Sequence, residues 1–335
     1  MDRERHIKPT TLILDSLHKE RERGGFVSGE ELADRLGMSR AAVWQRISEL
    51  RGMGYVIEAQ PHHGYRLANV PDRMLGYEIE RSLGTGIIGR NVICYDAVSS
   101  TNDIAAEMAE KGEPEGCAVF AECQRKGRGR MGRSWIAPTG KNILMTFILR
   151  PRMRAVNAPQ VTLMSAVACA EAIRVVTGLP ALIKWPNDIL IGDRKVCGIL
   201  VELFSELDGI RYILVGVGLN VNVRREEFPG EIVETATSLL DELGQKVSRI
   251  ALARELLQKL DENYSILRES GFSSIMDKWK EMSATLGRSI RVTWPDGKKE
   301  IGSAYALDAD GALLLRRETG FTARITSGDI QILGT

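Results

Sequence analysis

Near the start of the chain, apolar positions recur at the three-to-four-residue spacing of amphipathic helices. The pattern predicts one helix over residues 10–20 and a second that begins after the N-cap Ser28. Gly37, a residue suited to a left-handed turn, ends the second helix, and a third runs from its cap Ser39 to Arg51. Two short helices joined by a glycine turn predict a helix-turn-helix unit.

Two short apolar segments, 55–57 and 65–67, follow this unit and flank Pro61-His62-His63-Gly64. They predict a hairpin, or wing. Segment 35–66 contains five arginines and two glutamates, a local charge of +3. Arginine and glutamine on the outer side of the third helix suit guanine and adenine edges. DNA binding is therefore favoured over a plain helical adaptor that never touches DNA.

Residues 69–76 contain a proline and predict a linker. Residues 84–89 match a dinucleotide-binding fingerprint by glycine spacing. A helical stretch precedes them and a strand follows, which is the reverse of what a Rossmann turn needs. We expect a simple loop there.

Beyond the linker, short strands and helices alternate irregularly, which is typical of an α+β domain. Alternating apolar positions after residue 286, with turns at Pro295-Asp296-Gly297 and Asp308-Ala309-Asp310-Gly311, predict a small barrel. The expected fold class is α+β, with a winged helix-turn-helix over 1–68, a central mixed β-sheet domain over 69–285, and a small SH3-like β-barrel over 286–335. The expected central strands are 92–97, 117–123, 142–149, 181–184, 189–191, 196–203 and 211–220, and the helices are 101–111, 160–177, 248–268 and 273–282.

Composition narrows the class of protein. The chain has 335 residues and a formal charge of only +1, so nucleic-acid binding must come from local patches. Residues 1–5 are charged and predict no signal peptide, and no apolar run approaches membrane-spanning length. Five scattered cysteines without Cys-x-x-Cys spacing indicate reduced thiols and no structural zinc. We expect a cytoplasmic protein without membrane contact.

The stretch 127–135, Gly-Arg-Gly-Arg-Met-Gly-Arg-Ser-Trp, is the strongest candidate site. From 125 to 133 there are five cations and no acid. Glycine lets the backbone approach a ligand, and guanidinium groups hold carboxylate or phosphate oxygens. We expect a loop that is mobile until an anion binds. The alternative is a solvated basic loop or a non-specific nucleic-acid patch.

The same stretch is one residue from a P-loop, with Arg133 where lysine should stand. A P-loop must open a helix. Pro138 and Gly140 prevent a useful helix here, so we keep an anion site and reject the P-loop.

Four further motifs accompany this loop in order: Ser99-Ser100-Thr101-Asn102, Lys184-Trp185-Pro186-Asn187-Asp188, Lys195 to Glu202, and Gly216-Val217-Gly218-Leu219-Asn220. The ordered set resembles the biotin–protein ligase family. With the amino-terminal unit, notably Gly37 to Ala42, the chain resembles the bacterial proteins that are both biotin ligase and biotin-operon repressor. The resemblance covers nearly the whole chain.

The resemblance implies a two-step reaction. Biotin and ATP, with Mg²⁺, give biotinyl-5′-adenylate and pyrophosphate, and a lysine of the biotin carboxyl carrier protein, a subunit of acetyl-CoA carboxylase, then takes the biotinyl group. The same adenylate, biotinyl-5′-AMP, would act as corepressor for a homodimer that binds the operator DNA of biotin biosynthesis genes. A carboxylate must attack a polyanion in the first step, so the site needs cations.

The resemblance also implies roles for individual residues. Biotin contacts fall on Ser100, Thr101, Asn102, Gln124, Arg128, Gly129, Arg130 and Lys195, with Arg130 and Lys195 as catalytic residues. Nucleotide contacts fall on Arg133, Trp135, Lys184, Asn187 and Asn220, Mg²⁺ on Asp188, and DNA contacts on Ser39, Arg40, Ala41, Trp44, Gln45 and Arg46.

Each motif also has an ordinary structural explanation. Ser100 to Asn102 suit a helix N-cap, Asn187-Asp188 a turn, Trp135 a half-buried side chain and Lys195 a solvated one. Two other functions remain open: a transcription regulator that binds a small carboxylate without ligating it, and a ligase for another acid such as lipoate. Pyrophosphate release on adding biotin, and the identity of the activated acid, would separate them.

Overall fold

The computed structural model describes residues 9–206 and 209–333 and divides the chain into two compact units, Met1–Asp72 and Arg73–Thr335. The charged residues 1–5, on which the signal-peptide prediction depends, lie outside the described residues.

The first unit has the predicted winged helix-turn-helix order. It comprises α1 (Pro9–Arg23), α2 (Gly29–Leu36), α3 (Arg40–Gly52), β1 (Val56–Gln60) and β2 (Gly64–Asn69). The predicted caps are confirmed: the Ser28 hydroxyl accepts from the Glu30 N–H, and the Ser39 hydroxyl accepts from the Ala42 N–H, both at 3.2 Å. Gly37 adopts the left-handed conformation that ends α2.

The wing is longer than predicted because its strands pair from Val56 to Asn69. Residue 69 therefore belongs to β2 and not to the linker. Gly64 has a φ of +104°, and a Cβ there would lie 2.1 Å from the Val27 carbonyl oxygen. Only glycine fits this close crossing of the wing and the α1–α2 connection.

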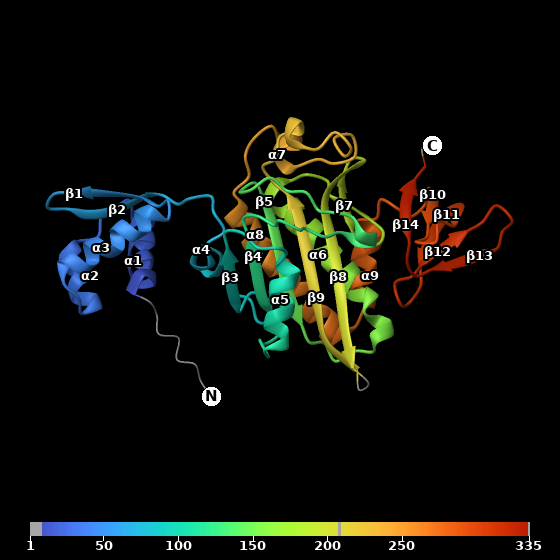
Figure 1. Cartoon of the computed structure of the whole chain (residues 1–335), viewed down its shortest axis with the longest axis horizontal. Helices are drawn as coiled ribbons and strands as arrows, with labels where there is room; N and C mark the ends of the chain where they lie inside the picture. The colour runs from blue at the N-terminus through green and yellow to red at the C-terminus, as the bar shows by residue number, and fades with distance from the viewer. Residues whose placement is uncertain (1–8, 207–208, 334–335) are drawn as a thin grey trace. The chain divides into compact units, whose positions relative to one another are not determined.

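The second unit is built on a seven-stranded mixed sheet (Figure 1). The strands pair in the order β3-β4-β5-β9-β8-β7-β6, and among the described strand pairs of this sheet only β3 and β4 run parallel. Every residue of β5 is buried, as its continuous apolar run predicts. The bounds are β3 (Asn91–Tyr95), β4 (Cys117–Ala121), β5 (Asn142–Leu149), β6 (Leu182–Lys184), β7 (Asp188–Ile191), β8 (Arg194–Glu206) and β9 (Gly209–Asn220).

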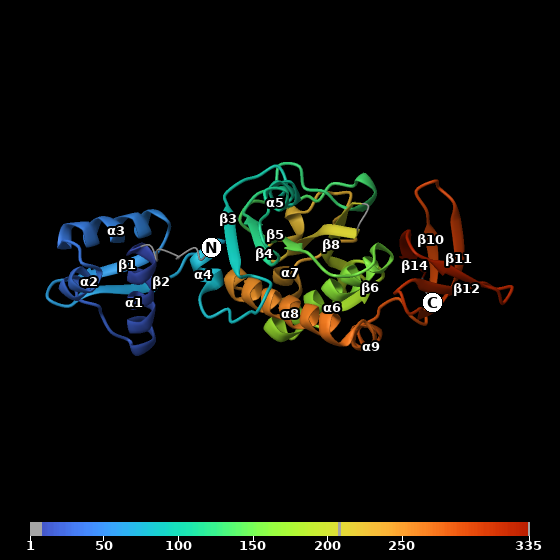
Figure 2. The ribbon, with the colours of Figure 1, turned by 90° about the horizontal axis from the view of Figure 1, so that it is seen from below.

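Helices cover both faces of this sheet. In two perpendicular views, α5 (Thr101–Glu110) lies on one face, and α6 (Pro159–Thr177) and α8 (Arg249–Ser270) lie on the other (Figures 1 and 2). The helical stretch predicted before residue 84 is α4 (Gly76–Glu80), and α9 (Ser273–Glu281) was also predicted. The five-residue helix α7 (Leu239–Leu243) was missed from the sequence.

One prediction about apolar runs was wrong. Segment Ala155–Thr177 is long and apolar enough to cross a membrane by length and composition. Its most apolar window is 67% buried within the second unit, where α6 packs against α8 and α9. Because the helix is mostly buried, its apolar composition is explained by packing in the protein core.

The glycine-rich loop over 84–89 connects α4 to β3, as predicted. Its backbone N–H groups at Gly86, Ile87 and Ile88 all donate to the Asp261 carboxylate of α8, at 2.7–2.8 Å. The loop therefore binds a carboxylate of the same chain, and its glycine spacing serves helix packing.

The carboxyl-terminal segment forms a small antiparallel β domain with strand order β13-β12-β11-β10-β14. Trp185 attaches it to the central sheet, because the indole N–H donates to the Gly311 carbonyl at 3.2 Å. Its strands are β10 (Ser289–Thr293), β11 (Lys299–Leu307), β12 (Leu313–Arg316), β13 (Thr322–Ile325) and β14 (Asp329–Ile332). The last two were missed from the sequence.

Candidate active site

One cavity of about 780 Å³ gathers the predicted chemistry. It lies in the second unit between the cationic loop, the β8–β9 strands, the turn before β7 and the last strand of the small β domain. Every residue predicted to contact biotin, nucleotide or metal lines it, namely Ser100, Thr101, Asn102, Gln124, Arg128, Gly129, Arg130, Arg133, Trp135, Lys184, Asn187, Asp188, Lys195 and Asn220. Segments far apart in the sequence thus meet at one site.

A buried polar cluster forms one end of the cavity. Ser100 caps α5 by accepting from the Asn102 N–H at 3.3 Å, so the structural prediction for this motif is confirmed. The Gln124 side-chain oxygen accepts from the Thr101 N–H and lies 2.9 Å from the Thr101 hydroxyl. Ser100, Thr101 and Asn102 are each at most 5% exposed. The cluster offers a ligand directed hydrogen bonds inside a largely dry wall.

The cationic loop folds back on itself as a narrow turn. Gly129 donates to the Arg133 carbonyl at 2.7 Å, and Trp135 donates to the Gly127 carbonyl at 2.9 Å. At the tip, Met131 and Gly132 both have positive φ, +56° and +73°. A methionine in this conformation is uncommon and marks local backbone strain at the tip.

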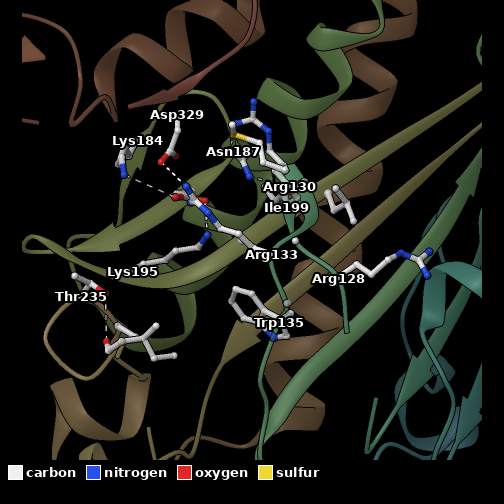
Figure 3. Close-up of a pocket in the computed structure, with 18 of the residues that line it drawn as sticks. Arg128, Arg130, Arg133, Trp135, Lys184, Asn187, Lys195, Ile199, Thr235 and Asp329 are labelled. Atoms are coloured by element: carbon white, nitrogen blue, oxygen red, sulfur yellow. Dashed lines mark hydrogen bonds and ion pairs between the residues drawn. The ribbon is translucent and has the colours of Figure 1, made fainter. Parts of the chain in front are cut away.

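Each loop arginine in the cavity already has an oxygen partner. Arg128 donates to Asp103 at 2.6 Å and extends away from the other two (Figure 3). Arg130 donates to the Asn187 side-chain oxygen at 2.8 Å and to the Gly328 carbonyl at 3.2 Å. Arg133 pairs with Asp329 at 2.7 Å.

These contacts, together with burial, shift the pKa values of Asp329 and Arg130. Burial alone would raise the pKa of Asp329, but the hydrogen bond and charge of Arg133 outweigh it and the pKa is lowered. Burial lowers the pKa of Arg130, while Asp188 and Asp329 counter that effect. Guanidinium groups keep their charge in proteins, so Arg130 remains a cation.

Two lysines share one carboxylate beside the loop. Lys195 Nζ lies 2.6 Å from one oxygen of Asp188, and Lys184 Nζ lies 3.9 Å from the other. The Asp188 side chain is 17% exposed. In this structure Asp188 therefore serves as the counter-ion of both lysines.

The described residues contain no group of three or more histidine, cysteine or acidic side chains that could hold a metal ion. A magnesium ion here would need the oxygens of a bound phosphate chain, with Asp188 as a protein contact. Such shared coordination is usual for Mg²⁺ at nucleotide sites.

Trp135 lies over a floor made of two glycines. Gly198 of β8 and Gly218 of β9 are direct partners across the sheet. A Cβ on Gly218 would lie 2.5 Å from the indole, and one on Gly198 would lie 3.0 Å from it. Lys195 Nζ lies 5.5 Å from the indole ring centre. The two glycines therefore leave the space that the indole occupies beside Lys195.

Two buried polar atoms of cavity residues make no hydrogen bond in the described part of the chain: Trp135 Nε1 and Asn220 Oδ1. Unpaired buried polar groups are rare and call for a partner. A bound ligand with an acceptor near Trp135 Nε1 and a donor near Asn220 Oδ1 would satisfy both atoms.

Sequence reasoning missed several cavity residues. Asp329 and the following strand β14 line it, as do Asp193 and the 235–236 segment, whose Thr235 carbonyl accepts from the Lys195 N–H at 2.7 Å. None carries a motif. They reach the cavity only through the packing of distant segments.

In the first unit, the predicted DNA-contacting residues lie on the outer face of α3. Ser39, Arg40, Ala41, Trp44 and Gln45 are exposed, with Trp44 at 59%, and Arg46 is half-buried. Arg46 forms an ion pair with Glu49 at 2.7 Å. In the described residues Arg40 forms no such pair.

Comparison with known proteins agrees with this layout. A model of the biotin/lipoate A/B protein ligase family matches residues 95–220, an HTH domain matches 15–66, and a biotin protein ligase C terminal domain matches 285–333. The chain is 39% identical to the bifunctional ligase/repressor BirA of Bacillus spizizenii over 92% of this chain and 94% of that protein. It is 32% identical to BirA of Escherichia coli over 88% and 89% of the two chains.

A solved structure of the biotin protein ligase from Aquifex aeolicus, in complex with biotin and ATP, is also similar. It superposes with a TM-score of 0.64 at 28% identity, covering 73% of this chain and 100% of that one.

Proposed function

Because this chain belongs to the biotin–protein ligase family, within the group of bifunctional ligase/repressors, we propose that it is an ATP-dependent biotin–protein ligase that also represses transcription. The observation that carries the proposal is the single cavity in which the polar cluster, the arginine loop and two lysines meet. Such an arrangement suits the joining of two anions.

In the proposed first step, the biotin carboxylate attacks the α-phosphate of ATP and pyrophosphate leaves. The polar cluster of Ser100, Thr101, Asn102 and Gln124 holds the head group. The proposed role of Lys195 and Arg130 is to bind the carboxylate and the α-phosphate where the two react, with Arg128 and Gly129 bordering the carboxylate. Their charges stabilise the transition state more than the separate reactants, because negative charge is most concentrated there.

The nucleotide occupies the side of the cavity formed by Arg133, Trp135, Lys184, Asn187 and Asn220. The unpaired oxygen of Asn220 supports a donor from the nucleotide at that position. Asp188, together with the phosphates, would hold a magnesium ion, which would offset part of the phosphate charge. In the second step, the lysine amine of a biotin carboxyl carrier protein attacks the acyl carbon and AMP leaves.

We assign repression to the first unit and ligation to the rest, with functional parts at 1–68, 69–285 and 286–335. One exposed α3 face, within segment 35–66 whose local charge is +3, is a small footprint, which supports operator binding by a homodimer reading two half-sites. Biotinyl-5′-AMP acts as corepressor by favouring that dimer. The five free cysteines support a cytosolic protein.

Biotin-dependent exchange of radiolabelled pyrophosphate into ATP tests the ligase. We expect exchange with biotin, none with lipoate, and transfer of label to a carrier domain on adding one. Lys195→Ala should slow adenylate formation more than it weakens ATP binding. An absence of exchange with biotin, together with adenylate-independent operator binding, would identify a pure regulator instead.

A further inference from the structure

A carboxylate without an assigned role lies behind the predicted acid-binding cluster. Glu202 of β8 accepts a hydrogen bond from Asn102 Nδ2 at 2.6 Å. Its other oxygen lies 3.6 Å from Arg128 of the loop. Asn102 is 5% exposed, whereas 30% of the Glu202 side-chain surface is exposed. The carboxylate therefore contacts the buried cluster from its solvent side.

The second contact of the Asn102 amide is with a hydroxyl. Thr146, fully buried on β5, lies with its Oγ1 2.5 Å from Asn102 Oδ1. A hydroxyl can donate or accept, so Thr146 would tolerate either orientation of the amide. An ionised carboxylate only accepts. Turning the amide round would place its oxygen against the Glu202 oxygens, so Glu202 alone dictates the orientation.

Strand β9 also limits the space around the amide. A Cβ on Gly216 of β9 would lie 2.5 Å from Asn102 Oδ1, so the amide lies directly against this strand. Its oxygen faces Thr146 and one of its two N–H bonds is taken by Glu202. The second N–H has no hydrogen-bond partner among the described residues, and Asn102 lines the cavity, so this N–H is the donor available to a ligand.

We propose that Glu202 is a positioning residue for the ligase reaction. It fixes Asn102 as a hydrogen-bond donor toward an acceptor atom of the bound acid, such as the ureido oxygen of biotin. The inference rests on the proposed function. It adds Glu202 as the residue that fixes the orientation of the Asn102 amide in the acid-binding cluster.

Glu202→Gln tests the role of the charge, because glutamine keeps the shape but can donate or accept. Without the acceptor-only group, the Asn102 amide populates both orientations. We expect biotin affinity, measured by calorimetry without ATP, to fall by about tenfold, with ATP affinity changed less than about twofold. Glu206→Gln is the control: Glu206 lies on the same strand, faces Arg211 at 3.4 Å and is outside the cavity. It should leave both affinities unchanged.

Asn102→Asp combined with Glu202→Gln reverses the direction of the hydrogen bond. Asn102→Asp alone places two carboxylates together and should lower both the melting temperature and biotin affinity. The double variant should recover the melting temperature, because the pair is complementary again, but not the biotin affinity, because the introduced carboxylate has no N–H to offer.

Three outcomes would overturn the inference: wild-type biotin affinity in Glu202→Gln, wild-type biotin affinity in the double variant, or an equal loss of biotin and ATP binding in Glu202→Gln. A wild-type protein that binds biotin but exchanges no pyrophosphate would instead contradict the proposed ligase function.

Discussion

At the scale of single residues, the shape of the cavity depends on two glycines, which have no side chain, as much as on the side chains that line it. The glycine pair Gly198 and Gly218 leaves a flat floor, and Trp135 fills the space that side chains would take. The half-buried indole, whose N–H has no partner in the described part of the chain, is held by shape and by its neighbour Lys195. The position of the indole should therefore be sensitive to a single methyl group.

Gly218→Ala should slow adenylate formation roughly tenfold, because overpacking a rigid ring usually costs enough to displace it. Single-turnover formation of the adenylate and the near-ultraviolet dichroism of tryptophan would report the rate and the displacement. Gly230→Ala is the matched control, since a Cβ at Gly230 meets no atom within 4 Å and its φ is not left-handed. A normal rate in Gly218→Ala would mean that Trp135 does not need this floor.

At the scale of elements, the helices and strands with long apolar runs were the ones predicted most accurately from the sequence. β5 and α6 were predicted within one residue because long apolar runs define them. β13 and β14 have four residues each and mix polar with apolar positions, so pairing partners decide them and local sequence does not. Asp329 was missed for the same reason: it lines the cavity because β14 packs beside the cationic loop, which local sequence does not reveal.

The predicted DNA-contacting face of α3 allows a prediction within one element. Arg40→Ala should weaken operator binding by about tenfold, whereas Arg46→Ala should cost less, because Arg46 is already paired with Glu49. Both variants remove one positive charge, so the net charge of the protein changes equally in the two. Fluorescence anisotropy with operator DNA at fixed salt would measure the difference. Equal losses would assign the effect to charge alone.

At the scale of the whole second unit, the small β domain restrains the loop. Asp329 holds Arg133, and the Gly328 carbonyl holds Arg130. The pKa of Asp329 is lowered from its ordinary 3.8, so the carboxylate is ionised at neutral pH. Any stability from this pair is present above about pH 4 and is lost as the pH falls below 3.8.

Asp329→Asn should lower the KM for ATP by about two- to fivefold, because a phosphate no longer competes with a carboxylate for Arg133. The effect should be constant from about pH 6 to 9, since Asp329 does not titrate there. Asp310→Asn, which removes a carboxylate that pairs with Arg324 outside the cavity, is the charge-matched control. A KM that rises in Asp329→Asn would show that the carboxylate positions Arg133 for the nucleotide.

The partners of the loop arginines also bear on how the site empties. Arg128, Arg130 and Arg133 each contact an oxygen of the protein itself. An incoming phosphate gains only the difference between its own bonds and those that it replaces. In the proposed reaction these protein oxygens would compete with the nucleotide phosphates for the arginines and would pair with them again when AMP leaves. Such exchange would favour turnover, because departure of AMP would leave none of these three cations without a partner.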